Sequence, residues 1–178
     1  MKTSMLVALA AGLAVAPASV AQMPCAGLQT RPIKALSEQQ LSDLKAGRGM
    51  GLALAAELNG YPGPSHLLEL AEPIGLTDPQ RQAVRELFDA MKAETIAIGE
   101  QLIGQEAELD ALFARREATA ERITALTEAI GSTQARLRAA HLRYHLSTLD
   151  LLRPAQVERY AELRGYGGGG GQHRHHGR

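Results

Sequence analysis

Two long stretches of helical periodicity constrain the fold of this 178-residue chain more than any other feature. From Asp78 to about Phe113, apolar residues recur at intervals of three and four, a spacing that only a helix brings to one face. A second stretch follows Thr119 and continues to about Thr148. At 1.5 Å per residue the first helix would run about 50 Å, which is long for a globular domain and suits one arm of a hairpin.

Each long stretch has a defined apolar face. The first carries a single inward stripe, formed by Val84, Leu87, Phe88, Met91, Ile98, Leu102, Leu109 and Leu112. The second carries two stripes, which require two packing partners: the first arm, and either the N-terminal helices or a second subunit. Because the charged cluster 115–117 interrupts the pattern between them, the two stretches are expected to fold back on each other as an antiparallel pair.

A short motif marks where helices begin. The residues Leu76 to Gln80 precede the first long stretch, and a near-copy occupies Leu36 to Gln40. In both copies the Ser or Thr hydroxyl can accept from the N–H three residues on while the Gln reaches back, which is a capping box. A degraded copy from Leu152 to Gln156 has proline at the first helical position and predicts a closing helix over Pro154 to Leu163.

Shorter helices are expected before the hairpin. Apolar spacing over 37–58 predicts a helix that is bent or split by three glycines near its middle. The segment Asn59 to Pro64 is the strongest breaker in the chain, and Ser65 is expected to cap a short helix after it. The predicted fold class is therefore all-α, a long antiparallel helical hairpin with shorter N- and C-terminal helices packed across it.

The N-terminus resembles an export signal. Lys2 is followed by the apolar run Met5 to Ala16 and then by small residues, which predicts a signal peptide over 1–21, cleaved after about Ala21, and a periplasmic protein. The apolar run is too short to cross a bilayer, so we expect no membrane span in the mature chain.

The remaining boundaries follow from composition. Residues 22–35 are predicted to be a disordered N-terminal segment, 36–166 the helical domain and 167–178 a disordered Gly/His-rich tail. Flexible glycine with clustered imidazole suits a metal-binding tail or a solvated polar one. The only cysteine, Cys25, is either a free thiol or an intermolecular bridge.

Composition and missing motifs exclude several classes. The chain has 19 basic and 19 acidic residues, a balance that argues against nucleic acid as the main partner. The sequence contains no strand–turn–helix nucleophile motif, no glycine-rich phosphate loop and no Cys-x-x-Cys pair. We therefore expect a binding protein that is not an enzyme and has no organic cofactor.

One histidine pair carries possible chemistry. His141 and His145 stand four apart on the second long helix, with Cβ atoms about 6 Å apart, a spacing that can hold one metal ion. Folding the hairpin places His141 opposite Met91 and His145 within a turn of Glu86, while His66 lies on the short helix that folds back. Imidazole and carboxylate together suit Zn, Ni, Co or Cu, whereas Mg and Ca prefer oxygen ligands. We predict a metal site of His66, Glu86, His141 and His145; the alternative is that each has only a structural or solvated role.

The leader, the capped hairpin and the terminal Leu-x-Pro-Ala-Gln helix together resemble the Spy/CpxP family of periplasmic LTxxQ proteins, over roughly Leu36 to Tyr166. This resemblance implies an ATP-independent stress chaperone that forms a homodimer and holds unfolded or envelope proteins. Within the family, CnrX-like sensors and ZraP-like proteins bind transition metals. The sensors place a histidine on the first helix, a carboxylate on the next and a histidine pair on the returning arm, a layout matched by His66, Glu86, His141 and His145.

The sequence thus supports two main functional hypotheses. The first is a periplasmic chaperone with metal binding as a coupled property. The second is a periplasmic heavy-metal sensor or metal buffer that acts through a regulatory envelope partner. A structural envelope protein with one fixed partner is a third possibility.

Overall fold

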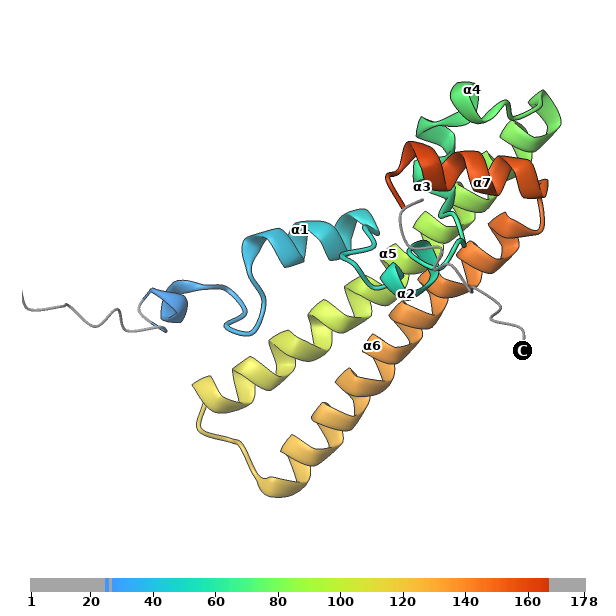
Figure 1. Ribbon diagram of the computed structural model, residues 1–178. Coiled ribbons are helices and arrows are strands. Elements are labelled where there is room, and N and C mark those ends of the chain that lie inside the picture. Colours follow the sequence, from blue (N-terminus) through green and yellow to red (C-terminus); the bar gives the residue numbers. More distant parts are fainter. Residues whose placement is uncertain (1–24, 26, 167–178) are drawn as a thin grey trace, which may run out of the picture.

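The computed structural model describes residues 25 and 27–166, and within them every regular element is a helix (Figure 1). The chain forms, in order, the short 3-10 helix η1 (Leu28–Thr30), α1 (Glu38–Ala46), α2 (Leu54–Glu57), α3 (Pro64–Glu69), α4 (Ala71–Ile74), α5 (Asp78–Ala114), α6 (Ala120–Leu149) and α7 (Pro154–Leu163). This confirms the predicted all-α fold with a long hairpin and shorter helices. The predicted signal peptide (1–21) and tail (167–178) lie outside the described residues.

Helices α5 and α6 form the hairpin and lie side by side over most of their length (Figure 1). An ion pair between Arg143 and Glu94 at 2.5 Å joins the two helices on the surface. A hydrogen bond of 3.1 Å from Arg136 to Gln101 does the same further along. Arg116 in the connecting turn has a φ of 59°, the left-handed conformation that reverses the chain. The antiparallel pairing expected for the two long helical stretches is therefore present.

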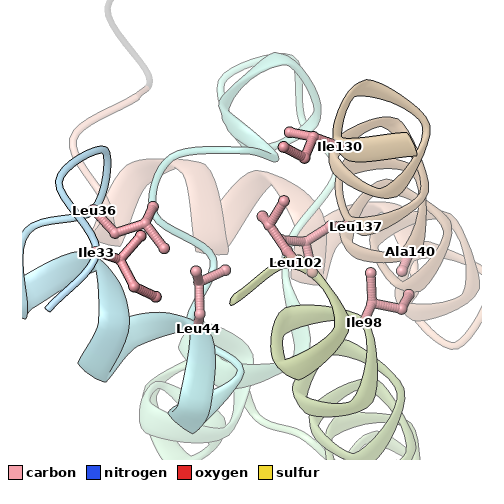
Figure 2. Close-up of a cluster of buried hydrophobic side chains, with 8 residues drawn as sticks. All are labelled: Ile33, Leu36, Leu44, Ile98, Leu102, Ile130, Leu137 and Ala140. Carbon is pink, nitrogen blue, oxygen red and sulfur yellow. The ribbon is translucent and has the colours of Figure 1, made fainter. Parts of the chain in front are cut away.

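The larger hydrophobic cluster joins the hairpin to the N-terminal segment (Figure 2). Its buried members are Ile33, Leu36, Leu44, Ile98, Leu102, Ile130, Leu137 and Ala140. Ile33 is 7% exposed, and residues 28–30 form a 3-10 turn, both inside the 22–35 segment that was predicted to be disordered. Packing against the hairpin therefore begins at Ile33, three residues before the predicted boundary at Leu36. The physical reason is that one isoleucine outside the helical pattern still gains by leaving water.

The helix starts follow the capping motifs. Ser37 accepts from the N–H of Gln40 at 3.1 Å and donates its own N–H to the Gln40 side chain at 2.9 Å, so the predicted capping box is present, and Thr77 makes the same box. Thr119 caps α6 as expected. The predicted Ser65 cap is wrong: the N-cap is Gly63, two residues earlier, and α3 begins at Pro64, because proline fixes the φ of the first helical residue.

The glutamines of the motif also make a tertiary contact. Gln80 and Gln156 exchange two amide hydrogen bonds, of 2.9 and 3.1 Å. Gln80 also donates to the carbonyl of Leu151 at 2.8 Å, and Gln156 to that of Gly75 at 3.0 Å. Gln156 is 3% exposed. The pair therefore ties the start of α5 to the start of α7, beyond the capping role predicted from sequence.

Close backbone approaches place the N-terminal turn against α5. A Cβ atom on Gly99 would lie 2.6 Å from the carbonyl oxygen of Leu44, so glycine lets α1 pack directly on the α5 backbone. Gly47 ends α1 with a φ of 64°, in the left-handed conformation that glycine permits. The split predicted at these glycines is confirmed, since α2 starts only at Leu54. In the part of the chain that the structure describes, no helix combines the length and apolar character needed to cross a bilayer.

Candidate functional site

A cavity of about 570 Å³ lies between the hairpin and the short N-terminal segments. Its walls come from α5, α6, the turn after α1, α2 and the start of α3. The volume falls in the range of small-ligand sites, and the lining combines apolar side chains with a few polar groups. Its polar and sulfur-bearing members include Met50, Glu57, His66, Met91, His141 and His145.

His141 is buried in the wall of this cavity with one ring nitrogen unpaired. The side chain is 2% exposed, and its Nε2 has no hydrogen-bond partner among the described residues. Burial lowers the pKa of His141, and the nearby His145 lowers it further, so the neutral ring is favoured. A buried polar atom without a partner costs about 1–3 kcal/mol, and a neutral imidazole nitrogen is a common metal ligand.

The ring of His145 is held in a defined tautomer. Its Nδ1 lies 2.7 Å from the carbonyl oxygen of Tyr61. A carbonyl can only accept, so Nδ1 carries the hydrogen, and in the neutral ring Nε2 has the lone pair. A Cβ atom on Gly63 would lie 2.8 Å from that Nε2, so a side chain at this position would occupy the space beside it. The breaker segment 59–64 thus supplies both the carbonyl and the room that the imidazole needs.

Glu57, at the end of α2, is the carboxylate next to the imidazoles. It is 4% exposed and accepts the N–H of Gly63 at 3.2 Å. Its Oε1 lies 3.3 Å from Nδ1 of His66, and its Oε2 lies 3.7 Å from Nδ1 of His145. A carboxylate oxygen accepts here, so the His66 contact places a hydrogen on Nδ1, and in the neutral ring Nε2 then has the lone pair that could bind an ion. A carboxylate behind a histidine is the arrangement that orients imidazoles in metal sites.

The C-terminal helix reaches the same carboxylate. Tyr160 of α7 is 1% exposed and donates its hydroxyl hydrogen to Oε1 of Glu57. Burial raises the pKa of Tyr160, and the hydrogen bond to Glu57 raises it further, so the phenol stays protonated and acts as a donor. Arg164 places Nε 3.7 Å from the same oxygen. These donors offset the cost of burying a negative charge.

The structure brings together three of the four predicted site residues. His66, His141 and His145 line one cavity, and Met91 lines it with them. Glu86 lies elsewhere: it is exposed on α5 and accepts a hydrogen bond from Gln82 at 2.8 Å. Successive residues of a helix are rotated by about 100° around its axis. Glu86, two residues after the buried Val84, therefore faces about 200° away from the buried side of α5.

The sequence analysis did not predict Glu57, which lies next to His66 and His145 where Glu86 was expected. Its helix is one turn long, and the glycines before it blur the periodicity that would show which face is buried. One signal was present: Glu57 is the only acidic or basic side chain, histidine aside, between Arg48 and Glu69. A lone charge in so apolar a stretch is a sign of a paired, buried group.

The side chains that line the cavity are of the types that bind transition metals, but they do not converge on one point. Among the described residues, no three His, Cys, Asp or Glu side chains converge as a group that could hold an ion. The chemistry of the donors, imidazole nitrogens with a thioether nearby, suits Zn, Ni, Co or Cu. The side chain of His66 is 41% exposed on a short helix, whereas that of His145 is 9% exposed. His66 from α3 and the pair His141 and His145 from α6 thus line one cavity without forming a complete ligand set among the described residues.

A second, apolar surface lies beside the cavity. A shallow groove between α2 and α6 is lined by Ala55, Ala56, Tyr61, Leu142 and Leu146. Leu146 is 54% exposed, and Leu58, at the C-terminal end of α2, is 57% exposed. Large apolar side chains exposed together are typical of surfaces that bind other proteins.

Comparison of the chain with protein-family models, curated protein sequences and solved structures found no match. Fold and site together therefore define the class only broadly, as an all-helical hairpin protein with a histidine-lined cavity.

Proposed function

We propose that this protein is an exported, Spy/CpxP-like helical protein that binds a transition-metal ion in the cavity between the hairpin and α3. The observation that carries the proposal is the unpaired, buried Nε2 of His141 beside His145, whose own Nε2 is left available by the Nδ1 bond to Tyr61. Two imidazoles four residues apart on one helix can bind the same ion. His66 supplies a third nitrogen from α3.

The ion class follows from the donors. Imidazole nitrogens favour Zn, Ni, Co or Cu over Mg or Ca, and the thioether of Met91 adds a soft donor at the wall. Glu57 serves as the carboxylate that orients the histidines, in place of the predicted Glu86.

Calorimetric titration with Zn(II), Ni(II), Co(II) and Cu(II) tests this proposal. The mature chain is compared with a variant in which His173, His175 and His176 are changed to alanine, which removes the histidines of the tail. In that background His141→Ala/His145→Ala is expected to weaken binding by at least about 100-fold, since a ligand matters more than its orienting partner. The far-UV circular dichroism should stay the same. Equal affinity with and without His141 and His145 would refute the site.

Chaperone activity is a second candidate, favoured by the exposed Leu146 of the apolar groove and the exposed Leu58 at the end of α2. Leu58 and Leu146 would contact an unfolded or envelope protein, and a homodimer would enlarge this surface. Light scattering of an aggregating client measures this activity, with Leu58→Ser/Leu146→Ser as the variant and Leu163→Ser, on the 36% exposed Leu163 of α7, as the control. Suppression that is equal in all three proteins would count against the groove.

A metal sensor or buffer would use the same histidines. It differs from the chaperone in that ion binding would change the affinity for a regulatory partner. Pull-down of envelope proteins with and without Zn(II) separates the two, since a chaperone without this coupling would capture the same set in both conditions.

A further inference from the structure

We propose that Tyr160 on α7 is a positioning residue for the cavity histidines: through Glu57 it sets which nitrogen of His66 is available to an ion. This inference rests on the proposed metal-binding function and adds a residue that lies outside the cavity lining. It also links the C-terminal helix to the site.

The link consists of consecutive contacts in a buried region. Tyr160 donates to Oε1 of Glu57, and the same oxygen lies 3.3 Å from Nδ1 of His66. The other carboxylate oxygen accepts from Gly63 and lies 3.7 Å from Nδ1 of His145. Without the phenol hydroxyl, Oε1 would lose its shortest contact, and the carboxylate could rotate away from His66.

Tyr160 has two separable roles because its ring and its hydroxyl face different groups. The ring belongs to the second hydrophobic cluster, formed with Leu67, Ala71, Ile74, Leu76 and Val84. The hydroxyl alone touches Glu57. Replacement by phenylalanine therefore keeps the packing of α7 and removes only the bond to the carboxylate.

The contact has a reciprocal consequence. Tyr160 and Glu57 are 103 positions apart in the chain, so their bond forms only when α7 is docked. If docked α7 improves the geometry for an ion, then a bound ion must stabilise docked α7 by the same factor. Metal binding is thus expected to slow hydrogen exchange of α7 amides.

Tyr160→Phe tests the positioning role, with Tyr144→Phe as the matched control. Tyr144 lies on α6 one position before His145, and its hydroxyl interacts with Glu94 instead of Glu57. In the background lacking tail histidines, Tyr160→Phe is expected to weaken Co(II) and Zn(II) binding by up to about 10-fold, at the low end of the effect of a direct outer-shell partner, because Tyr160 acts through Glu57. Tyr144→Phe should bind as the parent protein does. The visible spectrum of the Co(II) complex, which reports ligand geometry, should change only in Tyr160→Phe.

A measurement without metal separates this inference from the proposed function. Side-chain ¹⁵N NMR of the metal-free protein should show the hydrogen of His66 on Nδ1, and Tyr160→Phe should shift that signal toward a mixture of tautomers. Parent protein that binds no ion would overturn the proposed function, and this inference with it. Parent protein that binds tightly, with Tyr160→Phe showing the same affinity and the same His66 signals, would overturn the positioning role alone.

Discussion

Replacement of Gly99 by alanine should destabilise this protein even though alanine is the better helix former. Gly99 lies in the interior of α5, where glycine is normally the weaker choice. Here a Cβ atom would lie 2.6 Å from the carbonyl oxygen of Leu44 and 3.2 Å from its carbonyl carbon. Both are backbone atoms of α1, so no side-chain rotation can relieve the contact.

The magnitude follows from two opposing effects. Alanine gains about 0.8–1.0 kcal/mol over glycine in a helix interior. Overpacking of a well-filled contact costs about 1–3 kcal/mol, because α1 must move away from α5 by several tenths of an ångström. The net change for Gly99→Ala is therefore a loss of up to about 2 kcal/mol. Gly104, on the same helix, has no neighbouring atom within 4 Å of a built Cβ, so Gly104→Ala should stabilise by the full propensity difference.

Urea denaturation followed by circular dichroism at 222 nm measures both variants against the parent. We expect Gly104→Ala to be more stable than Gly99→Ala by about 1–3 kcal/mol in the free energy of unfolding. Gly99→Ala should also disturb the turn after Gly47, which forms one wall of the cavity. A Gly99→Ala protein that equals or exceeds Gly104→Ala in stability would refute the close packing of α1 on α5.

Three further predictions concern stability. Leu137 lies in the hairpin core at 4% exposure, so Leu137→Ala should lower the free energy of unfolding, measured by urea denaturation, by about 2–5 kcal/mol. Leu87→Ala, at a half-buried position, should lower it by less, and equal losses for the two variants would contradict this packing. Gln156→Ala removes the hydrogen bonds of a buried amide to the half-buried Gln80 and the exposed Gly75 and should cost about 0.5–1.5 kcal/mol, seen as a lower thermal midpoint, and an unchanged midpoint would rule out the amide pair as a stabilising contact. Burial raises the pKa of Glu106 above 4.5, so the unfolded chain loses this proton first and stability falls as pH rises through the folded value. Glu106→Gln should therefore be more stable than the parent at pH 7 but not at pH 4, while the exposed Glu108→Gln should change stability by less than about 0.5 kcal/mol at either pH; similar effects at the two sites would speak against burial of Glu106.

The sequence by itself determined the elements that depend on neighbours within a turn or two. The capping boxes at Ser37 and Thr77 and the cap at Thr119 were predictable because donor and acceptor are three residues apart. The long helices followed from the spacing of apolar residues. The proximity of His141 and His145 was equally local, since residues four apart share a helix face.

The tertiary structure alone decided which other groups meet at the cavity. Glu57 comes from a one-turn helix and Tyr160 from the last helix, so no local spacing relates them. Glu86 was predicted because it is near His145 along the hairpin, but the rotation of α5 about its own axis turns it to solvent. That rotation, like the close approach at Gly99, is set by how whole helices pack, a property of side chains distant in sequence.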